Sequence, residues 1–224
     1  MRARLSIVIP TLNAEATLPA VLIALMEGVE AGLVRELIVT DGGSQDATRA
    51  IAEEVGAIWI TDEAGRGGQL ARGCAKAGGD WMLVLHADSV PGPGWVEAVE
   101  RGMLRGEPGY FRLRFAARGL APRLTAGWAN LRSALFGLSF GDQGLLVSRA
   151  DYMAAGGYPD VPLMEDMALV RALPRPRPLD AWVETSWTRY RGRWLAQGSR
   201  NLIRQARFLV GADPAKLARG YRTD

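Results

Sequence analysis

The stretch Leu5-Ser-Ile-Val-Ile-Pro-Thr-Leu-Asn-Ala-Glu-Ala16 decides the fold. Its apolar run stops at a proline after five residues, which predicts a short buried strand rather than a signal peptide or a membrane span. The turn that follows contains no glycine, so it cannot be the Gly-x-Gly-x-x-Gly loop of a Rossmann dinucleotide binder. The chain also has no Walker phosphate loop. Because many functions share this kind of strand, the other loops have to distinguish between them.

Short apolar runs recur along the first half of the chain and alternate with segments of helical periodicity. We predict strands at Leu5–Ile9, Glu36–Thr40, Ala57–Thr61 and Trp81–Leu85, and helices near Thr17–Glu27, Asp46–Val55 and Gly68–Ala77. Strands that are apolar throughout and separated by helices indicate a parallel sheet covered on both faces. Ligands of such sheets collect at the carboxyl ends of the strands, so the polar residues after each strand are the candidate site.

The second half of the chain has a different pattern. Helices are predicted at Gly94–Arg105 and Leu124–Leu135, and strands at Tyr110–Phe115 and Leu145–Ser148. The segment Pro174-Arg-Pro-Arg-Pro178 is predicted to break the chain before a last long helix, Arg193–Val210. No internal repeat or linker is visible, so we predict one α/β domain over residues 1–224 with two functional halves.

Composition excludes several kinds of site. The single cysteine, Cys74, rules out an internal disulfide and favours a reducing compartment, and the single histidine, His86, rules out a zinc site built on several His or Cys ligands. Residues 171–224 hold 12 Lys+Arg against 4 Asp+Glu, a net of +8, whereas the rest holds 15 against 20, a net of −5. This basic quarter suits an anionic partner such as a diphosphate, a lipid headgroup or nucleic acid, or is simply a solvated face.

Four polar segments follow one another in a recognisable order. They are Ser6-Ile-Val-Ile-Pro-Thr-Leu-Asn-Ala-Glu15, Asp41-Gly-Gly-Ser-Gln-Asp-Ala-Thr48, His86-Ala-Asp88 and Glu165-Asp166. The series resembles the family 2-like glycosyltransferases, along almost the whole chain, and in particular a bacterial branch with His-Ala-Asp in place of Asp-x-Asp.

The resemblance implies the GT-A fold, a Rossmann-like, mostly parallel sheet with helices on both faces and a C-terminal helical segment. It also implies transfer of a sugar from a nucleotide-diphosphate sugar to an acceptor, with inversion and dependence on a metal. Residues 1–115 would be the nucleotide-sugar-binding half, and 116–224 the acceptor and catalytic half with a C-terminal amphipathic helix.

The resemblance assigns the nucleotide to the loops after the first three strands. Asp41 would accept a hydrogen bond from the base, although an aspartate also opens turns of this kind. Thr11, Asn13 and Glu15 would line the base and ribose pocket, or instead cap the helix predicted to begin at Thr17. Arg66, in Gly65-Arg-Gly-Gly-Gln69, would reach the diphosphate or the base across glycines that allow close backbone approach.

The segment His86-Ala87-Asp88 occupies the position of the family's metal-binding motif. Asp88 keeps the carboxylate that would hold Mg²⁺ or Mn²⁺ on the donor diphosphate, a site that needs only one or two protein oxygens. The cation would offset the charge that develops on the departing diphosphate. His86 replaces the usual aspartate, and we place it in the nucleotide site as a ribose contact, a second ligand or a spacer.

The segment Met164-Glu165-Asp166 follows Gly156-Gly-Tyr-Pro159, as it does in similar transferases. Asp166 would be the base that takes the proton from the acceptor hydroxyl, and Glu165 would contact the acceptor or raise the proton affinity of its neighbour. The alternative is that two acidic residues simply favour a helix N-terminus. Gly141-Asp142-Gln143-Gly144 would shape the acceptor side.

Other readings stay open at this stage. A nucleotide-binding protein without catalysis is one, and a sugar-phosphate nucleotidyltransferase is another, although the Gly-rich Arg/Lys loop that such enzymes carry after the first strand is absent. The last helix has an apolar face and an arginine face, so it either packs on the body or meets a membrane surface near a lipid-linked acceptor. No nucleic-acid partner is expected. The sequence predicts a cytoplasmic protein, with peripheral contact at the inner membrane surface left open.

Overall fold

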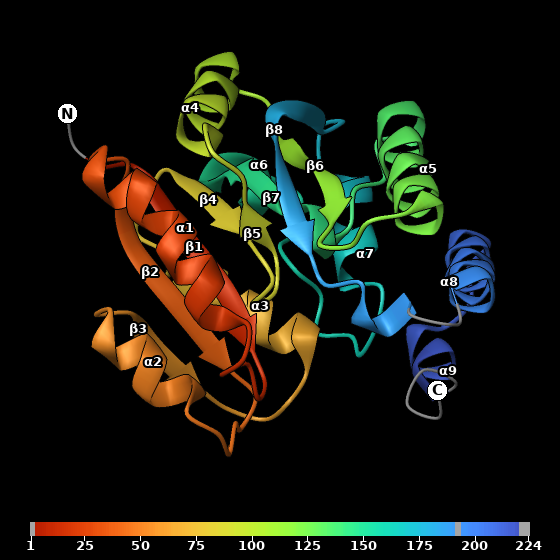
Figure 1. Cartoon of the computed structure of the whole chain (residues 1–224), viewed down its shortest axis with the longest axis horizontal. Helices are drawn as coiled ribbons and strands as arrows, with labels where there is room; N and C mark the ends of the chain where they lie inside the picture. The colour runs from red at the N-terminus through yellow and green to blue at the C-terminus, as the bar shows by residue number, and fades with distance from the viewer. Residues whose placement is uncertain (1–2, 191–193, 220–224) are drawn as a thin grey trace.

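One eight-stranded sheet runs through the computed structural model, which describes residues 3–190 and 194–219 (Figure 1). The strand order is β3-β2-β1-β4-β7-β6-β8-β5. The four predicted apolar strands of the first half are all present and pair in parallel: β1 (Leu5–Thr11), β2 (Val34–Asp41), β3 (Ile58–Thr61) and β4 (Trp81–Val84). The prediction of a parallel sheet in the first half is confirmed.

The other half of the sheet is mixed. It contains β5 (Val90–Pro91), β6 (Gly109–Phe115), β7 (Leu145–Ser148) and β8 (Arg177–Thr185). Strand β7 is antiparallel to both β4 and β6, and β8 is parallel to β6, so β6 and β8 run in the same direction as β1. Strand β5 closes this side, antiparallel to β8. The carboxyl ends of β1, β2, β4, β6 and β8 therefore point toward one edge.

Helices cover both faces of the sheet, as predicted. One core cluster packs α1 (Leu18–Glu30), α4 (Trp95–Arg105) and α5 (Leu120–Phe136) against the sheet. The other packs α3 (Arg66–Lys76), α6 (Arg149–Ala154) and α7 (Glu165–Ala172) on the opposite face. Helix α1 shows why the pattern works, because it buries Leu18, Val21, Leu22 and Leu25, which share one helical face.

The remaining helices lie toward the ends of the sheet. Helix α2 (Thr48–Glu54) contacts β3, while α8 (Trp194–Leu209) and α9 (Pro214–Arg219) form the C-terminal helical segment at the opposite side of the molecule (Figure 1). Residues 191–193 lie outside the described residues, so the predicted start of the last helix at Arg193 is not tested. Among the described residues, no helix combines the length and apolarity needed to cross a bilayer.

Strand β8 was not predicted from the sequence. We expected the proline-rich segment Pro174–Pro178 to break the chain before the last helix, but the longest strand begins within it, at Arg177. The alternation was present in the sequence, because Leu179, Ala181, Val183 and Thr185 are all buried. Strand β5 pairs only with residues 183 and 184 of β8, so the edge of β8 that faces β5 has no neighbouring strand at Pro178. A proline is tolerated at such a position because no backbone N–H is needed there.

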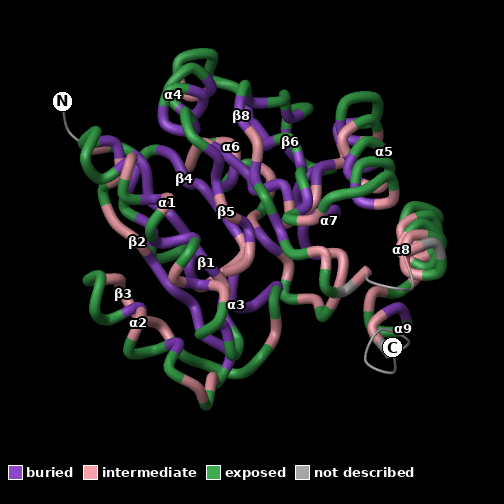
Figure 2. The backbone as a smooth tube through the Cα atoms, viewed as in Figure 1, coloured by how far each residue is buried: buried purple, intermediate pink, exposed green. Residues whose placement is uncertain are grey.

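The two strands β6 and β8 extend past the edge of their neighbour. Gly109, the first residue of β6, pairs with Leu146 near the start of β7, and the rest of β6 continues beyond it beside β8. Figure 2 shows the central strands buried and the outer sides of the helices exposed. The overhanging ends of β6 and β8 form one wall above the edge where β1 and β4 end.

Candidate active site

An open cleft of about 1070 Å³ lies at this edge, between the first strands and the wall formed by β6, β8 and α8. Ligand sites of open α/β sheets are found at this position, because the loops after parallel strands converge there. Most of the predicted site residues line the cleft: Thr11, Asn13, Arg66, His86, Asp88, Glu165 and Asp166. Asp41 and Glu15 do not line it. The chain thus brings together residues from four separate loops.

Asp41 is buried at the end of β2, and its carboxylate is fully engaged. Oδ1 accepts hydrogen bonds from Thr11 Oγ1 at 2.8 Å and Ser44 Oγ at 2.5 Å, and Oδ2 accepts from the N–H groups of Gly43 and Ser44 at 2.8 and 2.7 Å. Burial alone would raise the pKa of Asp41, but these hydrogen bonds together hold it below its usual value. A carboxylate offers about four acceptor positions. The predicted contact with a base therefore requires that one of these bonds be exchanged.

Asn13 and Glu15 join the first loop to the second. Asn13, which has a positive φ of 50°, accepts a hydrogen bond from the Gln45 N–H through Oδ1 at 2.9 Å. Glu15 Oε2 accepts from the Ala47 N–H at 2.9 Å, directly before helix α2. Glu15 therefore holds the N-terminus of α2, a helix distant in sequence, and not the helix after Thr17 that it was expected to cap as the alternative to nucleotide binding. Both polar side chains stabilise the loops under the cleft.

Arg66 begins helix α3 and faces the part of the cleft that contains Glu165. Its Nε lies 3.8 Å from Oε1 of the buried Glu165. The glycines beside it allow a close approach to the protein's own chain, because a Cβ on Gly67 would lie 2.8 Å from the backbone nitrogen of Val161. In this structure these glycines let α3 pack under the loop that precedes α7, and their role toward a bound nucleotide stays a prediction.

The segment from His86 to Asp88 forms a turn, closed by a hydrogen bond from the Ser89 N–H to the His86 carbonyl at 3.1 Å. It follows β4, which ends at Val84, one residue before the predicted end at Leu85. Both side chains are half-buried and line the cleft. Ser89 Oγ also donates to the Asp142 carbonyl at 3.4 Å, which holds the turn against the loop before β7.

His86 and Asp166 meet across Gly141. The Gly141 N–H donates to Asp166 Oδ2 at 3.0 Å. A Cβ on Gly141 would lie 2.6 Å from this same oxygen and closer still to His86 Nε2, so the imidazole and the carboxylate face one small space. These residues come from the loops after β4, before β7 and at the start of α7.

The carboxyl groups at the start of α7 are buried and adjacent in sequence. The pKa of Asp166 is raised to about 7: burial is the largest cause, the charges of Glu165 and Asp142 act in the same direction, and Arg66 and the Gly141 N–H oppose the shift. Burial also raises the pKa of Glu165, against the opposing effect of Arg66. Helix α7 begins at Glu165, so the acidic residues do stand at a helix N-terminus. A buried carboxyl with a pKa near neutrality is suited to take up and release a proton.

Asp142 and Arg132 continue the polar floor toward α5. Burial raises the pKa of Asp142, opposed by Arg132, while the negative charge of Asp88 adds to the rise. Its Oδ1 is buried and has no hydrogen-bond partner among the described residues. Burial lowers the pKa of Arg132 to about 10, so the guanidinium stays charged at neutral pH, stacked 4.0 Å above the ring of Phe140.

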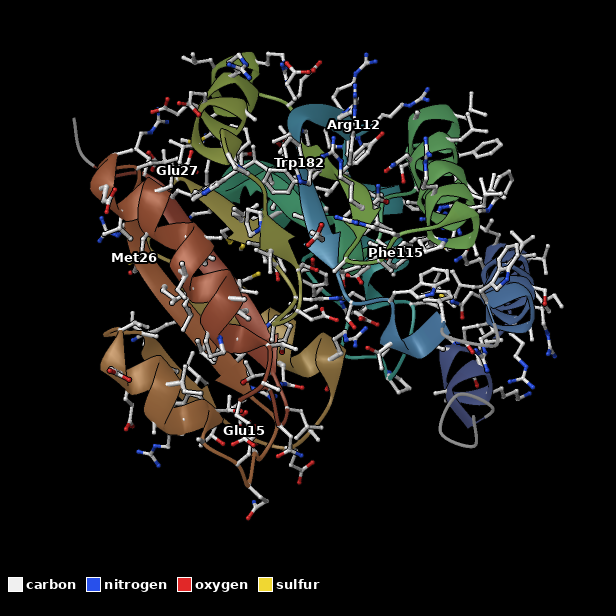
Figure 3. The ribbon with its side chains drawn as sticks, viewed as in Figure 1. Glu15, Met26, Glu27, Arg112, Phe115 and Trp182 are labelled. Atoms are coloured by element: carbon white, nitrogen blue, oxygen red, sulfur yellow. The ribbon has the colours of Figure 1, made fainter. Side chains whose placement is uncertain are left out.

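Aromatic side chains form the wall opposite the first loops. Trp187 and Tyr190 stack with ring centroids 5.0 Å apart, and both contact the edge or face of Phe115 at 4.9 and 5.4 Å. Figure 3 shows Phe115 at the end of β6, on the side of α8. Phe115 and Tyr190 line the cleft together with the half-exposed Trp128 of α5. Such surfaces suit the apolar faces of a sugar or another apolar group.

Comparison with known proteins identifies the family. The model of the family described as Glycosyl transferase family 2 matches residues 6–125, more than half of the chain. The chain belongs to glycosyl transferase family 2. The recognition made from the sequence and the predicted GT-A fold are both confirmed.

Curated relatives of this family member are glucosyl-3-phosphoglycerate synthases from Mycobacterium tuberculosis and Mycobacterium bovis. Each is 35% identical over 113 residues, which cover 46% of this chain and 35% of the relative. The matched region thus spans about a third of the length of these relatives.

Solved structures extend the similarity to nearly the whole chain. The synthase from Mycobacterium tuberculosis in complex with Mn²⁺, uridine diphosphate and phosphoglyceric acid has a TM-score of 0.60 and 25% identity, covering 94% of this chain and 80% of that one. TarS from S. aureus has a TM-score of 0.63 at 15% identity, covering 96% of this chain and 68% of that one, which is a likeness of fold alone.

The family match ends at residue 125, before the acidic residues of the second half of the chain. Three acidic residues of the cleft lie beyond residue 125: Asp142, Glu165 and Asp166. Membership of glycosyl transferase family 2 therefore rests on the region that contains the first strands and the loops that follow them. The sequence assigns Asp142 only to the acceptor side, without a chemical role, and it assigns no site role to Arg132, Phe115 or Trp128. Only Asp142 carried a signal, since it follows a glycine and precedes a strand. The others are ordinary residues of amphipathic elements until the fold places them in the cleft.

Gly141 provides a direct test of this arrangement. Gly141→Ala should lower sugar transfer at least about tenfold, because a methyl group would enter the space shared by His86 and Asp166 and displace the carboxylate. Initial rates at saturating donor measure the effect. Gly127→Ala is the matched control, since a Cβ there meets nothing within 4 Å. Equal rates for both variants would show that the His86–Asp166 contact is not needed.

Proposed function

We propose that this chain transfers a sugar from a uridine-diphosphate sugar to an acceptor hydroxyl, with inversion, using Asp166 as the base. The observation that carries the proposal is the buried Asp166 carboxyl, with a pKa near 7, at the floor of a cleft that also contains Asp88. The uridine donor is supported by the synthase structures, whose ligands are uridine diphosphate and uridine-diphosphate-glucose.

The donor side of the cleft is residues 1–115. Thr11 and Asn13 line the region assigned to the nucleoside, and Asp41 lies directly beneath Thr11, to which it is hydrogen-bonded. The base would reach Asp41 by replacing the Thr11 or Ser44 hydroxyl as donor. Arg66, at the N-terminus of α3, is within the cleft and oriented toward its acidic floor, where a diphosphate would gain a charge-assisted contact.

A divalent cation fits the acidic floor. Among residues 3–190 and 194–219 no group of three or more His, Cys, Asp or Glu is arranged to hold a metal. Mg²⁺ and Mn²⁺ on nucleotides need fewer protein ligands, because phosphate and water oxygens complete the shell. The oxygen ligands present suit these cations. The negative charge of Asp88 helps to raise the pKa of Asp142, so the two carboxyl groups are neighbours, and Asp142 Oδ1 is buried without a hydrogen-bond partner among the described residues. Asp88 would hold the cation, which stabilises the departing diphosphate.

The proton step belongs to Asp166. In the ionised form its Oδ2 is held by the Gly141 N–H, so the carboxylate is fixed before an acceptor arrives. It removes the proton of the acceptor hydroxyl while the oxygen attacks the anomeric carbon on the side opposite the diphosphate. Glu165 keeps the proton affinity of Asp166 high, and its contact with Arg66 couples this pair to the donor side.

The acceptor side would be residues 116–224, together with the overhanging end of β6. Arg132 offers a cation and Phe115, Trp128 and Tyr190 offer apolar surface, so the acceptor would combine an apolar part with a polar or anionic one. The sugar and the acceptor are both substrates to be found by screening.

The proposal is tested by donor turnover. Purified protein with Mn²⁺ should release uridine diphosphate slowly from one uridine-diphosphate sugar by transfer to water, and faster when the right acceptor is added. Chelation with EDTA should abolish release. Tight nucleotide binding without turnover of any donor and acceptor would instead identify a nucleotide-binding protein without catalysis. Release of pyrophosphate from a nucleoside triphosphate and a sugar phosphate would identify a nucleotidyltransferase.

A further inference from the structure

The outer face of helix α5 is apolar and exposed. Its large exposed side chains are Leu120, Leu124, Trp128, Leu131 and Leu135, with exposed fractions of 76, 61, 50, 50 and 57%. They are spaced by four, four, three and four residues and so form one stripe along the helix. The face that packs on β6 is made of small residues instead: Pro122, Ala126, Ala129 and Ser133. This stripe, called here the α5 stripe, points away from the sheet, and Figure 2 shows that side of α5 as exposed.

The charged residues of α5 and of the turn before it are all arginines. Residues 118–136 contain no Asp or Glu, and the exposed Arg118 and Arg123 stand at the N-terminal end of α5. Arg175 stands at the other end, where it donates to the carbonyls of Ala134 and Leu135 at 2.6 and 2.8 Å. Helix α8 also lacks acidic residues and exposes Leu202 and Ile203 beside its arginines.

We propose that the α5 stripe, together with α8, docks on an anionic lipid surface. Apolar side chains flanked by arginines without acidic residues match the interface of an anionic bilayer, which takes the apolar groups into its acyl boundary and attracts the cations. A second copy of this chain is a poorer occupant, because two such faces would bring like charges together.

The proposed docking surface lies next to the cleft. Helices α5 and α8 lie on the side of the molecule away from α1 and α2 (Figure 1), and Trp128 and Leu202 both line the cleft. Docking there would hold the acceptor side of the cleft at the lipid surface. The inference extends the proposed function but is tested without any donor, so the two can fail separately.

The test is sedimentation of the full chain with vesicles. Vesicles of phosphatidylcholine and phosphatidylglycerol in equal parts should bind the protein, pure phosphatidylcholine vesicles should bind it at least about tenfold more weakly, and high salt should release it. Leu124→Ser/Leu131→Ser should reduce binding at least about tenfold, and Arg118→Glu/Arg123→Glu should remove the preference for phosphatidylglycerol. All substituted side chains are exposed, so the fold should persist.

The matched control is Leu104→Ser on α4, since Leu104 is 87% exposed and lies outside the α5 stripe. This variant should bind vesicles like the wild type. Equal binding by the Leu124→Ser/Leu131→Ser variant, or no binding by the wild type, would overturn the proposal. A wild-type dimer in light scattering that the Leu124→Ser/Leu131→Ser variant dissociates would also overturn it and assign the face to a second copy of the chain.

Discussion

Asp166→Asn should lower sugar transfer by a factor of ~10²–10⁴, the usual range for loss of a general base. The amide keeps the shape of the carboxyl and the hydrogen bond from the Gly141 N–H, but it cannot take up the acceptor proton. Affinity for uridine diphosphate should stay within about twofold, because the base acts only on the acceptor. Rates at saturating donor, with calorimetry of nucleotide binding, measure the two effects separately.

The pH dependence provides a second readout for the same residue. The base must be ionised, and burial raises the pKa of Asp166 to about 7, so the wild-type rate should fall as the pH drops below 7. The folded protein favours the protonated carboxyl, so the stability it contributes at low pH is lost as the pH rises through 7. Above pH 7, Asp166→Asn should therefore be at least as stable as the wild type, which separates loss of chemistry from loss of fold.

The control is Asp160→Asn, an exposed carboxylate six residues earlier that does not line the cleft. It should turn over like the wild type. A stable Asp166→Asn protein with the wild-type rate and pH profile would exclude Asp166 as the base, and Asp142 or Glu165 would be the remaining buried carboxyls in the cleft.

Asp88→Asn should abolish most of the gain in nucleotide affinity that Mn²⁺ provides. The wild type should bind uridine diphosphate at least about tenfold more tightly with Mn²⁺ than with EDTA, because the cation joins the diphosphate to a carboxylate. The asparagine keeps the size of the side chain and removes its charge, so the two conditions should give nearly equal affinities. Titration calorimetry measures both.

Asp80→Asn is the control for the metal site. Asp80 stands directly before β4, at the opposite end of the strand from Asp88. It is paired with Arg4 at the surface. It should leave the Mn²⁺ effect intact. Wild-type binding that is indifferent to EDTA would show that no metal joins the nucleotide at Asp88.

The sequence alone determined the parallel part of the sheet and the loops that end its strands. Apolar runs and helical periodicity are local patterns, and they suffice for β1, β2, β3 and β4. The signal is strongest for β1 and β4, which are buried along nearly their whole length. The order of polar segments also identified the family, since those loops carry its motifs. Strand β8 was not predicted because the prolines of residues 174–178 indicated a break in the chain, although every second residue from Leu179 to Val183 is apolar.

Only the tertiary structure decided what each polar side chain can reach. Asp41 and Glu15 belong to two of the polar segments assigned to the nucleotide, but the fold engages their oxygens in hydrogen bonds with the protein itself. His86 and Asp166 are 80 residues apart, and they meet because β4 and β7 pair and place Gly141 between the two loops. The apolar spacing of α5 is readable in the sequence, but not its outward direction. That direction depends on the small residues that pack on β6, a contact between segments that no local pattern encodes.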